Sequence, residues 1–184
     1  MVSGLMYVIS LFLREGMGRT PSQAALSITP IAVGIIVASF VVRPLMSELG
    51  RNLLLAGLLL ALIGGGWTLA LVQADGTDVN IWALVPPVTV IGLGTGSCLG
   101  TLFDIALGDV SAEEAGSAGG ALSAIQQLSA AIGSAIMTTV FFHTLGGGQA
   151  HAMTVSLIVV LAVNAACLAL VWLLPRAAQA GRLE

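Results

Sequence analysis

Long apolar runs alternate with short polar connectors along the whole chain. Five of these runs could cross the roughly 30 Å hydrocarbon core of a bilayer as helices, which takes about 20 residues at about 1.5 Å each. The pattern predicts an all-α integral membrane protein with about six transmembrane helices. We expect these spans at residues 2–13, 22–42, 53–72, 81–103, 117–142 and 152–174, followed by a polar tail at 175–184.

The first run, Val2–Leu13, is shorter than the others. As a helix it would reach only about 18–20 Å, which is too little to cross the hydrocarbon core. It is therefore either an interfacial helix or the second half of a helix whose first half is missing. We expect the second, with Met1 an internal methionine of a longer reading frame or the start of a truncated gene.

The composition agrees with a membrane protein, since 57% of the residues are hydrophobic and 8% are charged. A soluble domain is about a quarter charged. No lysine is present, which excludes a Walker A ATPase and a Schiff-base enzyme. The net charge of −3 gives no basic surface for nucleic acid. Cys98 and Cys167 fall in apolar runs and are expected to be small hydrophobic residues, so we expect no metal and no cofactor.

The arginines in the connectors predict the orientation of the chain. If both termini are cytoplasmic, four arginines lie inside and two outside: Arg43, Arg51, Arg176 and Arg182 against Arg14 and Arg19. Cytoplasmic loops carry the excess of basic residues, so this distribution favours both termini inside.

Small residues recur four apart on three of the predicted helices. Such a row makes a flat groove that lets two backbones approach, and close approach is what drives helix association in lipid. We therefore predict helix-packing faces at Gly92, Gly96 and Gly100, at Gly116, Gly120 and Ala124, and at Gly57, Ala61 and Gly65. The run GLGTGSCLG could suggest a dinucleotide-binding loop, but it lies inside an apolar span with no strand before it.

Amide side chains stand out within the last two predicted spans. An amide in hydrocarbon must find a partner or face water. Gln126 and Gln127 point about 100° apart on a helix, so they serve different directions. Two interpretations stay open: hydrogen bonds between helices, worth about 0.6–2 kcal/mol each, or the lining of a substrate cavity. The candidates for such a lining are Ser123, Gln126 and Gln127, with Asn164 on the more peripheral last span.

Three stretches resemble a known family of transporters. RPLMSELGRNLLLAG resembles the second copy of the major facilitator cytoplasmic loop, through Arg43, Gly50 and Arg51. TPSQAALSITPIAVG resembles the fourteen-span drug–proton antiporter branch, the EmrB/QacA type. The segment Leu102–Phe142 resembles that branch more closely, with a Glu-Glu-Ala-Gly loop entering a small-residue helix that carries a glutamine pair. Ser129 departs from the branch, which has glycine after Gln-Gln-Leu.

The resemblance implies that these six spans are the C-terminal half of an exporter, built as a 3+3 inverted repeat. It implies a bacterial cell-membrane protein that exports small amphipathic or apolar molecules by proton antiport. The antiporter motif and the membrane-embedded acid of that branch belong to the other half. No acidic residue lies at mid-depth here, and Asp104 comes nearest. We therefore expect a lipid bilayer and an N-terminal half or mate chain as partners, and no transport by this chain alone.

Two other interpretations use the same residues. The chain could be a membrane subunit that pairs with a separate chain. It could also be an intramembrane protease, with Ser97 or Ser117 as the nucleophile. That chemistry needs a base within hydrogen-bond reach. Ser117 lies about 39 Å of helix from His143, and His151 lies in the same distant connector, so we disfavour the protease and expect no enzyme.

Overall fold

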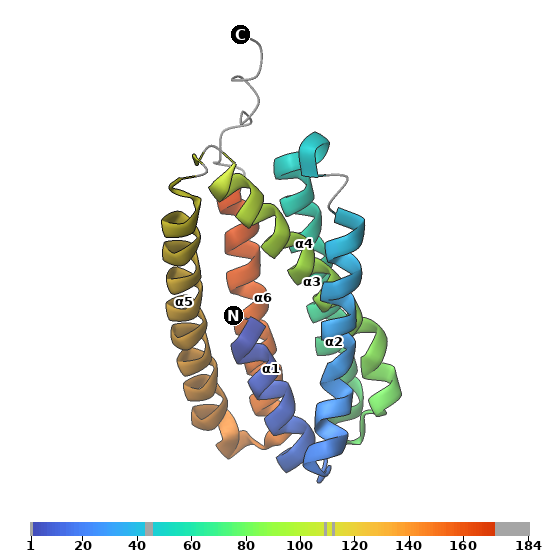
Figure 1. Ribbon diagram of the computed structural model, residues 1–184. Coiled ribbons are helices and arrows are strands. Elements are labelled where there is room, and N and C mark those ends of the chain that lie inside the picture. Colours follow the sequence, from blue (N-terminus) through green and yellow to red (C-terminus); the bar gives the residue numbers. More distant parts are fainter. Residues whose placement is uncertain (1, 43–45, 109, 112, 172–184) are drawn as a thin grey trace.

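The computed structural model describes residues 2–42, 46–108, 110–111 and 113–171. The described residues form six α-helices joined by short turns (Figure 1). In chain order the elements are α1 (Val2–Leu11), the π-helical η1 (Phe12–Gly16), α2 (Pro21–Val42), α3 (Met46–Asp75), the 3₁₀ turn η3 (Gly76–Asp78), α4 (Ile81–Leu107), α5 (Ala115–Thr144), the 3₁₀ turn η4 (Leu145–Gly147) and α6 (Gln149–Val171). We call the end that holds η1, η3 and η4 the lower end, as drawn in Figure 1.

Two helices begin at caps encoded in the local sequence. At the start of α2, the Gln23 backbone N–H donates to the Thr20 hydroxyl (3.3 Å) and the Thr20 N–H donates to the Gln23 side-chain oxygen (3.2 Å). This reciprocal pair is a capping box, and Pro21 occupies the first helical position, where its missing N–H costs nothing. At the start of α4, the Asn80 side chain accepts a bond from the Trp82 N–H (3.0 Å). Both caps fix the start of a helix at the lower end.

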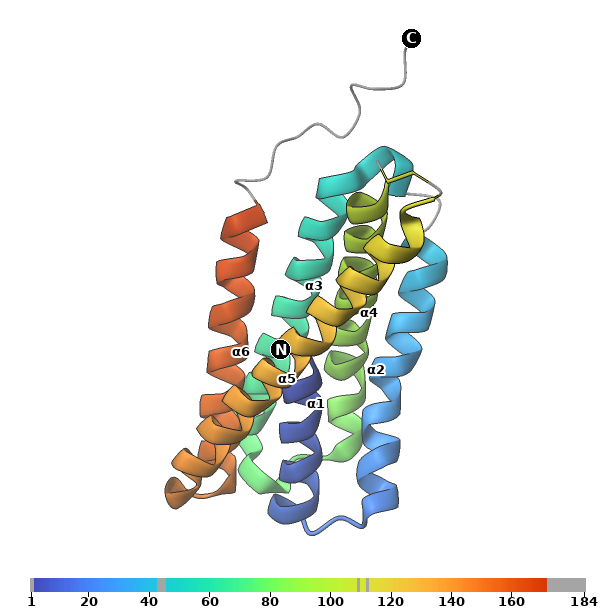
Figure 2. The same cartoon turned by 60° about the vertical axis from the view of Figure 1, so that its left-hand side comes forward.

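The helices pack in a pattern that repeats. α4 lies against both α2 and α3, α3 also contacts α6, and α5 contacts α1 and α6 (Figures 1 and 2). The helices α1, α2 and α3 correspond in order to α4, α5 and α6. Under this correspondence the contact between α2 and α4 matches the contact between α5 and α1. The contact of α3 with α4 likewise matches that of α6 with α1, which is also present. These two correspondences fit two three-helix repeats, while among the described residues the contact of α5 with α6 has no counterpart of similar extent between α2 and α3.

Among the described residues, five helical segments are long and apolar enough to cross a membrane: Pro21–Val42, Arg51–Asp78, Ile81–Leu107, Ala115–Gly147 and Gln149–Val171. α1 has ten residues, and the π-helical η1 extends it by five. The structure thus agrees with a first run that is too short to cross, and α1 reaches about half the height of the bundle in Figure 1.

Several helices are longer than the apolar runs predicted. α3 begins at Met46 rather than at residue 53, so Gly50 and Arg51 lie within a helix and not in a connector. α4 continues to Leu107, which brings Asp104 into its last turns. The reason is that hydropathy marks contact with lipid, whereas a helix continues into the polar headgroup region. The 30 residues of α3 span about 45 Å, well beyond a core of about 30 Å. Arg43, residues 172–174 of the last predicted span and the tail lie outside the described residues.

Candidate functional site

α5 carries three different faces along its length. One face turns into the bundle, and its residues are buried or half-buried: Leu122, Gln126, Ala130, Gly133, Met137 and Phe141. Here α1 approaches closely, because a methyl group placed on Gly4 would lie 2.8 Å from the Gly133 carbonyl oxygen and 2.7 Å from Met137 Cγ. Gln126 lies on this inward face, about 10 Å along the axis from that contact.

The second face of α5 is apolar and exposed. Ile125, Leu128, Ile132 and Ile136 are each about half or more exposed, at 62, 63, 53 and 48%. These residues lie three or four positions apart, so they form one stripe on a helix. Large aliphatic side chains are what a helix presents to lipid tails, and this stripe has that composition.

The third face is equally exposed but has a different composition. It consists of small or polar residues, Gly116, Gly120, Ser123, Gln127 and Ala131. We call it the small polar stripe. A methyl group placed on Gly116 or Gly120 would meet no atom within 4 Å. The structure therefore does not place these two glycines against another helix of this chain, because the upper half of α5 lies apart from its neighbours, and the packing face predicted for them stays a prediction.

Asn164 lies on the buried face of α6, four and eight residues after two buried positions, Val160 and Ser156. Its side-chain oxygen is buried and has no hydrogen-bond partner among the described residues. The Ser156 hydroxyl is in the same condition. Asn164 lies on the last span, which we expected to be the more peripheral one, and its side-chain oxygen is turned into the protein. Buried polar groups without partners are rare. The buried face of α6 therefore carries two unsatisfied polar side chains, Ser156 and Asn164, within the part of the chain that the structure describes.

The hydroxyl groups of Thr68 in α3 and of the threonines and serine in α4, by contrast, are satisfied within their own helices. Thr68 donates to the Gly64 carbonyl (2.9 Å), and Ser97 donates to the Leu93 carbonyl (2.8 Å). Ser117, in the first turn of α5, donates to the Glu114 carbonyl (2.9 Å). Neither Ser97 nor Ser117 is bonded to a histidine, and so the arrangement required of a protease nucleophile is not formed.

Glycines on opposite faces of α4 let this helix approach two neighbours at once. A methyl group on Gly92 would collide with the Ile31 backbone of α2, and one on Gly96 would lie 2.8 Å from the Ile35 carbonyl oxygen. Gly94 faces the other way, where a methyl group would lie 2.5 Å from the Gly57 carbonyl oxygen of α3. Gly100, one turn beyond Gly96, is half-buried. Gly92 and Gly96 of the predicted row thus face α2, and Gly94 lies on a second face of α4 that meets α3.

The row on α3 differs from the predicted one in its last member. Gly57 and Ala61 face α4, as the spacing suggests. The next glycine toward α4 is Gly64, where a methyl group would lie 2.7 Å from the Pro87 carbonyl oxygen. Gly65 instead faces α6, with Leu161 Cδ2 at 2.9 Å from a methyl group there. Residues 64–66 are all glycine, so the sequence alone could not show which of them faces α4 and which faces α6.

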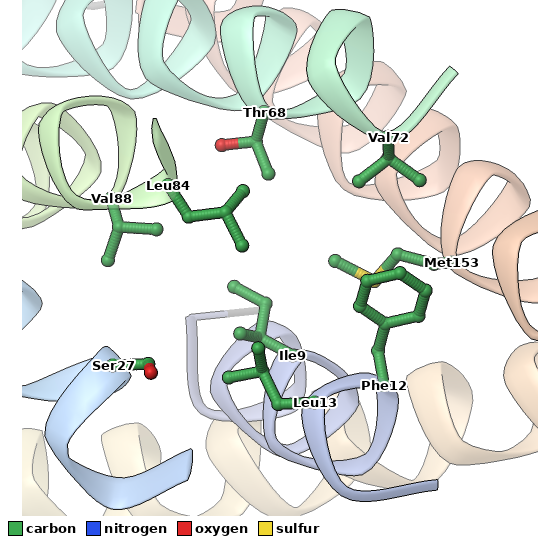
Figure 3. Close-up of a pocket in the computed structure, with 9 residues that line it drawn as sticks. All are labelled: Ile9, Phe12, Leu13, Ser27, Thr68, Val72, Leu84, Val88 and Met153. Atoms are coloured by element: carbon green, nitrogen blue, oxygen red, sulfur yellow. The ribbon is translucent and has the colours of Figure 1, made fainter. Parts of the chain in front are cut away.

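A small cavity lies near the lower end between α1, α2, α3, α4 and α6 (Figure 3). Its lining is apolar except for two hydroxyl groups: Ile9, Phe12, Leu13, Ser27, Thr68, Val72, Leu84, Val88 and Met153. Both hydroxyls are already bonded to their own helices, Ser27 to the Gln23 carbonyl (2.8 Å) and Thr68 to that of Gly64. The cavity is therefore a packing defect in the core and offers no free polar group to a substrate.

The sequence matches the model of the Major Facilitator Superfamily over residues 1–134. It is 40% identical over 146 residues to the "Probable actinorhodin transporter" of Streptomyces coelicolor, covering 79% of this chain and 25% of that protein. It is 29% identical over 140 residues to the "Multidrug resistance protein Stp" of Mycobacterium tuberculosis, with shares of 76% and 25%. The "Tetracycline resistance determinant" of Streptomyces rimosus is 28% identical over 141 residues, with shares of 77% and 40%.

The chain thus spans between a quarter and two-fifths of the length of these relatives. The family match covers most of its 184 residues, and within the part of the chain that the structure describes, five helices have the length and composition of membrane spans. This chain belongs to the Major Facilitator Superfamily, a family of multi-pass membrane transporters and not of enzymes.

Proposed function

We propose that this chain is the C-terminal half of a drug exporter of the fourteen-span, proton-coupled EmrB/QacA branch. The segment Leu102–Phe142, with its Glu-Glu-Ala-Gly loop and glutamine pair, supports that branch. The relatives named for actinorhodin, multidrug resistance and tetracycline resistance support small, amphipathic or apolar substrates. The arginine distribution supports cytoplasmic termini in a bacterial cell membrane.

The small polar stripe of α5 is the observation that carries this proposal. The aliphatic stripe beside it is just as exposed, and its composition is the one that suits contact with lipid tails. Glycine, serine and glutamine instead suit close contact with another helix or with a polar pathway. α2, the counterpart of α5 in the other repeat, also exposes small residues at Ala25, Thr29 and Ala32, and the same line continues through the exposed Ile36 to Ser39. The mate half of the transporter would lie against these two faces.

Four side chains are our candidates for the substrate pathway. Ser123 and Gln127 lie on the small polar stripe, Gln126 on the inward face of α5, and Asn164 on the buried face of α6. Their amides and hydroxyl can donate and accept hydrogen bonds without carrying charge. No Asp or Glu lies in the apolar middle of any span, so the proton-coupling acid would belong to the mate half. Alternating access would then rock one half against the other.

The test compares this chain alone with the chain joined to a mate half, in a drug-sensitised bacterium. The chain alone should give no resistance, and the joined halves should restore it. In the joined form, Gln127→Leu should lower the tolerated drug concentration by about tenfold, the change expected if one hydrogen bond to substrate is lost. Leu128→Ile, on the adjacent aliphatic stripe, is the matched control and should have no effect. Proton-driven efflux by the chain alone would contradict the proposal.

A membrane subunit that pairs with a separate chain is the second candidate, since the small polar stripe needs a mate but not a covalent link to it. The DNA upstream of Met1 distinguishes the two. An in-frame continuation that codes for further spans supports one long exporter. A ribosome-binding site before Met1, next to a gene for the other half, supports a subunit.

A further inference from the structure

α4 contains two consecutive prolines, Pro86 and Pro87, near its lower end. Proline has no backbone N–H, so each one removes a hydrogen bond to the carbonyl four residues earlier. The Trp82 and Ala83 carbonyls therefore lose their helical donors. The first turn of α4 is joined to the rest of the helix by a weakened ladder at this point.

Beyond the prolines, α4 is held firmly from two sides. Gly64 of α3 packs directly against the Pro87 carbonyl, and the glycines at 92, 94 and 96 bring α4 into backbone contact with α2 and α3. A rigid-body shift of this part would drive backbone atoms into one another. Any bending of α4 must therefore be taken up at or before Pro87.

Before the prolines, the first turn is closed on itself. The Asn80 side chain accepts from the Trp82 N–H, and the Asn80 carbonyl accepts from the Ala83 N–H at 2.9 Å. The Trp82 side chain is 79% exposed and so anchors nothing inside the bundle. Two side chains of this turn reach the core: Leu84 is 5% exposed and borders the small cavity (Figure 3), and Ile81 is partly buried against the core. A movement of the turn must therefore shift these two contacts.

We propose that residues 80–85 form a hinged flap at the lower end, which moves as one capped turn about Pro86–Pro87 while the rest of α4 stays clamped. One side-chain bond still crosses the hinge, from the Thr89 hydroxyl to the Val85 carbonyl (2.7 Å). It acts as a strut that limits the movement. This inference concerns motion of the helix and does not depend on the proposed substrate or coupling.

Hydrogen–deuterium exchange of the full chain in lipid nanodiscs tests the hinge. The double variant Pro86→Ala/Pro87→Ala restores two ladder bonds, and exchange at the amides of residues 83–85 should slow by about tenfold. Thr89→Val removes the strut, and exchange at the same amides should quicken. Pro30→Ala, in α2, is the control and should leave them unchanged. The same exchange rate in all three variants and in the parent chain would overturn the proposal.

A second measurement covers the case in which the double variant fails to fold. Nitroxide labels at Trp82→Cys and Ile158→Cys, in a Cys98→Ala/Cys167→Ala background, report the position of the flap relative to α6. The matched pair Leu99→Cys and Ile158→Cys reports the clamped part of α4. The flap pair should show the broader distance distribution. Equal widths would refute a hinge at the prolines.

Discussion

α4 and α5 are both long apolar helices rich in glycine, yet they stand in opposite surroundings. In an apolar 18-residue stretch of α4, 41% of the described residues are buried, compared with 17% in such a stretch of α5. The glycines of α4 at 92, 94 and 96 meet the backbones of α2 and α3, whereas a methyl group on Gly116, Gly119 or Gly120 of α5 would meet nothing within 4 Å. A glycine row therefore shows that a helix can be approached closely, but not which partner approaches it.

The difference has a physical origin in what each helix can bury. α4 is central, with one neighbour on each of two faces, so its glycines are used within this chain. The lower half of α5 is covered by α1 and α6, while its upper half extends away from them (Figure 2). The glycines and glutamine of that upper half are the part of the chain that we assign to contacts with a mate half.

Filling a glycine of α4 should have the largest effect. Gly92→Val drives a branched side chain into the Ile31 backbone, which cannot move without displacing α2. We expect a loss of about 3 kcal/mol or more in the free energy of unfolding, or failure to fold. Gly120→Val, on the open face of α5, should change it by less than about 0.5 kcal/mol in the same chain. Thermal unfolding in detergent measures both, and equal melting temperatures would remove the contrast between the helices.

The same contrast can be tested within one helix, two residues apart. Gly64→Ala places a methyl group 2.7 Å from the Pro87 carbonyl oxygen and should destabilise the chain by about 1–3 kcal/mol. Gly66→Ala meets nothing within 4 Å and should stabilise it by about 0.5–1 kcal/mol, because alanine is the better helix former. If both variants shift the melting temperature in the same direction, close backbone approach is not what holds α3 against α4.

The smallest expected effect concerns the amides. Asn164→Leu removes a buried oxygen that has no partner among the described residues, so the isolated chain should gain about 1 kcal/mol of stability. Gln127→Leu replaces an exposed amide and should change stability by less than about 0.5 kcal/mol. Chemical unfolding in detergent measures both. A loss of stability in Asn164→Leu would show that the amide is satisfied within this half.

The apolar runs predicted much of the fold, and the sequence named the same four pathway candidates that we propose, but not the helix faces on which they lie. The spans were placed within a few residues wherever the run ended at the helix end, as at Val42 of α2 and Ile81 of α4. They were too short where a polar turn continued the helix, as at Gly50 and Arg51. The sequence could not predict that Gly64 faces α4 while Gly65 faces α6, or that Gln126 faces inward while Gln127 is exposed. Spacing gives relative directions on a helix and not the neighbours that lie there.

The sequence by itself determined that this protein lives in a bilayer, how many helices can cross it, and that their apolar middles carry no acidic residue. Only the tertiary structure decided which face of each helix meets protein. In water a helix reveals its buried face by being apolar there and polar elsewhere. In lipid both faces are apolar, so the periodicity that marks the core of a soluble protein is lost. Which face is buried is then decided by how closely the backbones of neighbouring helices can pack.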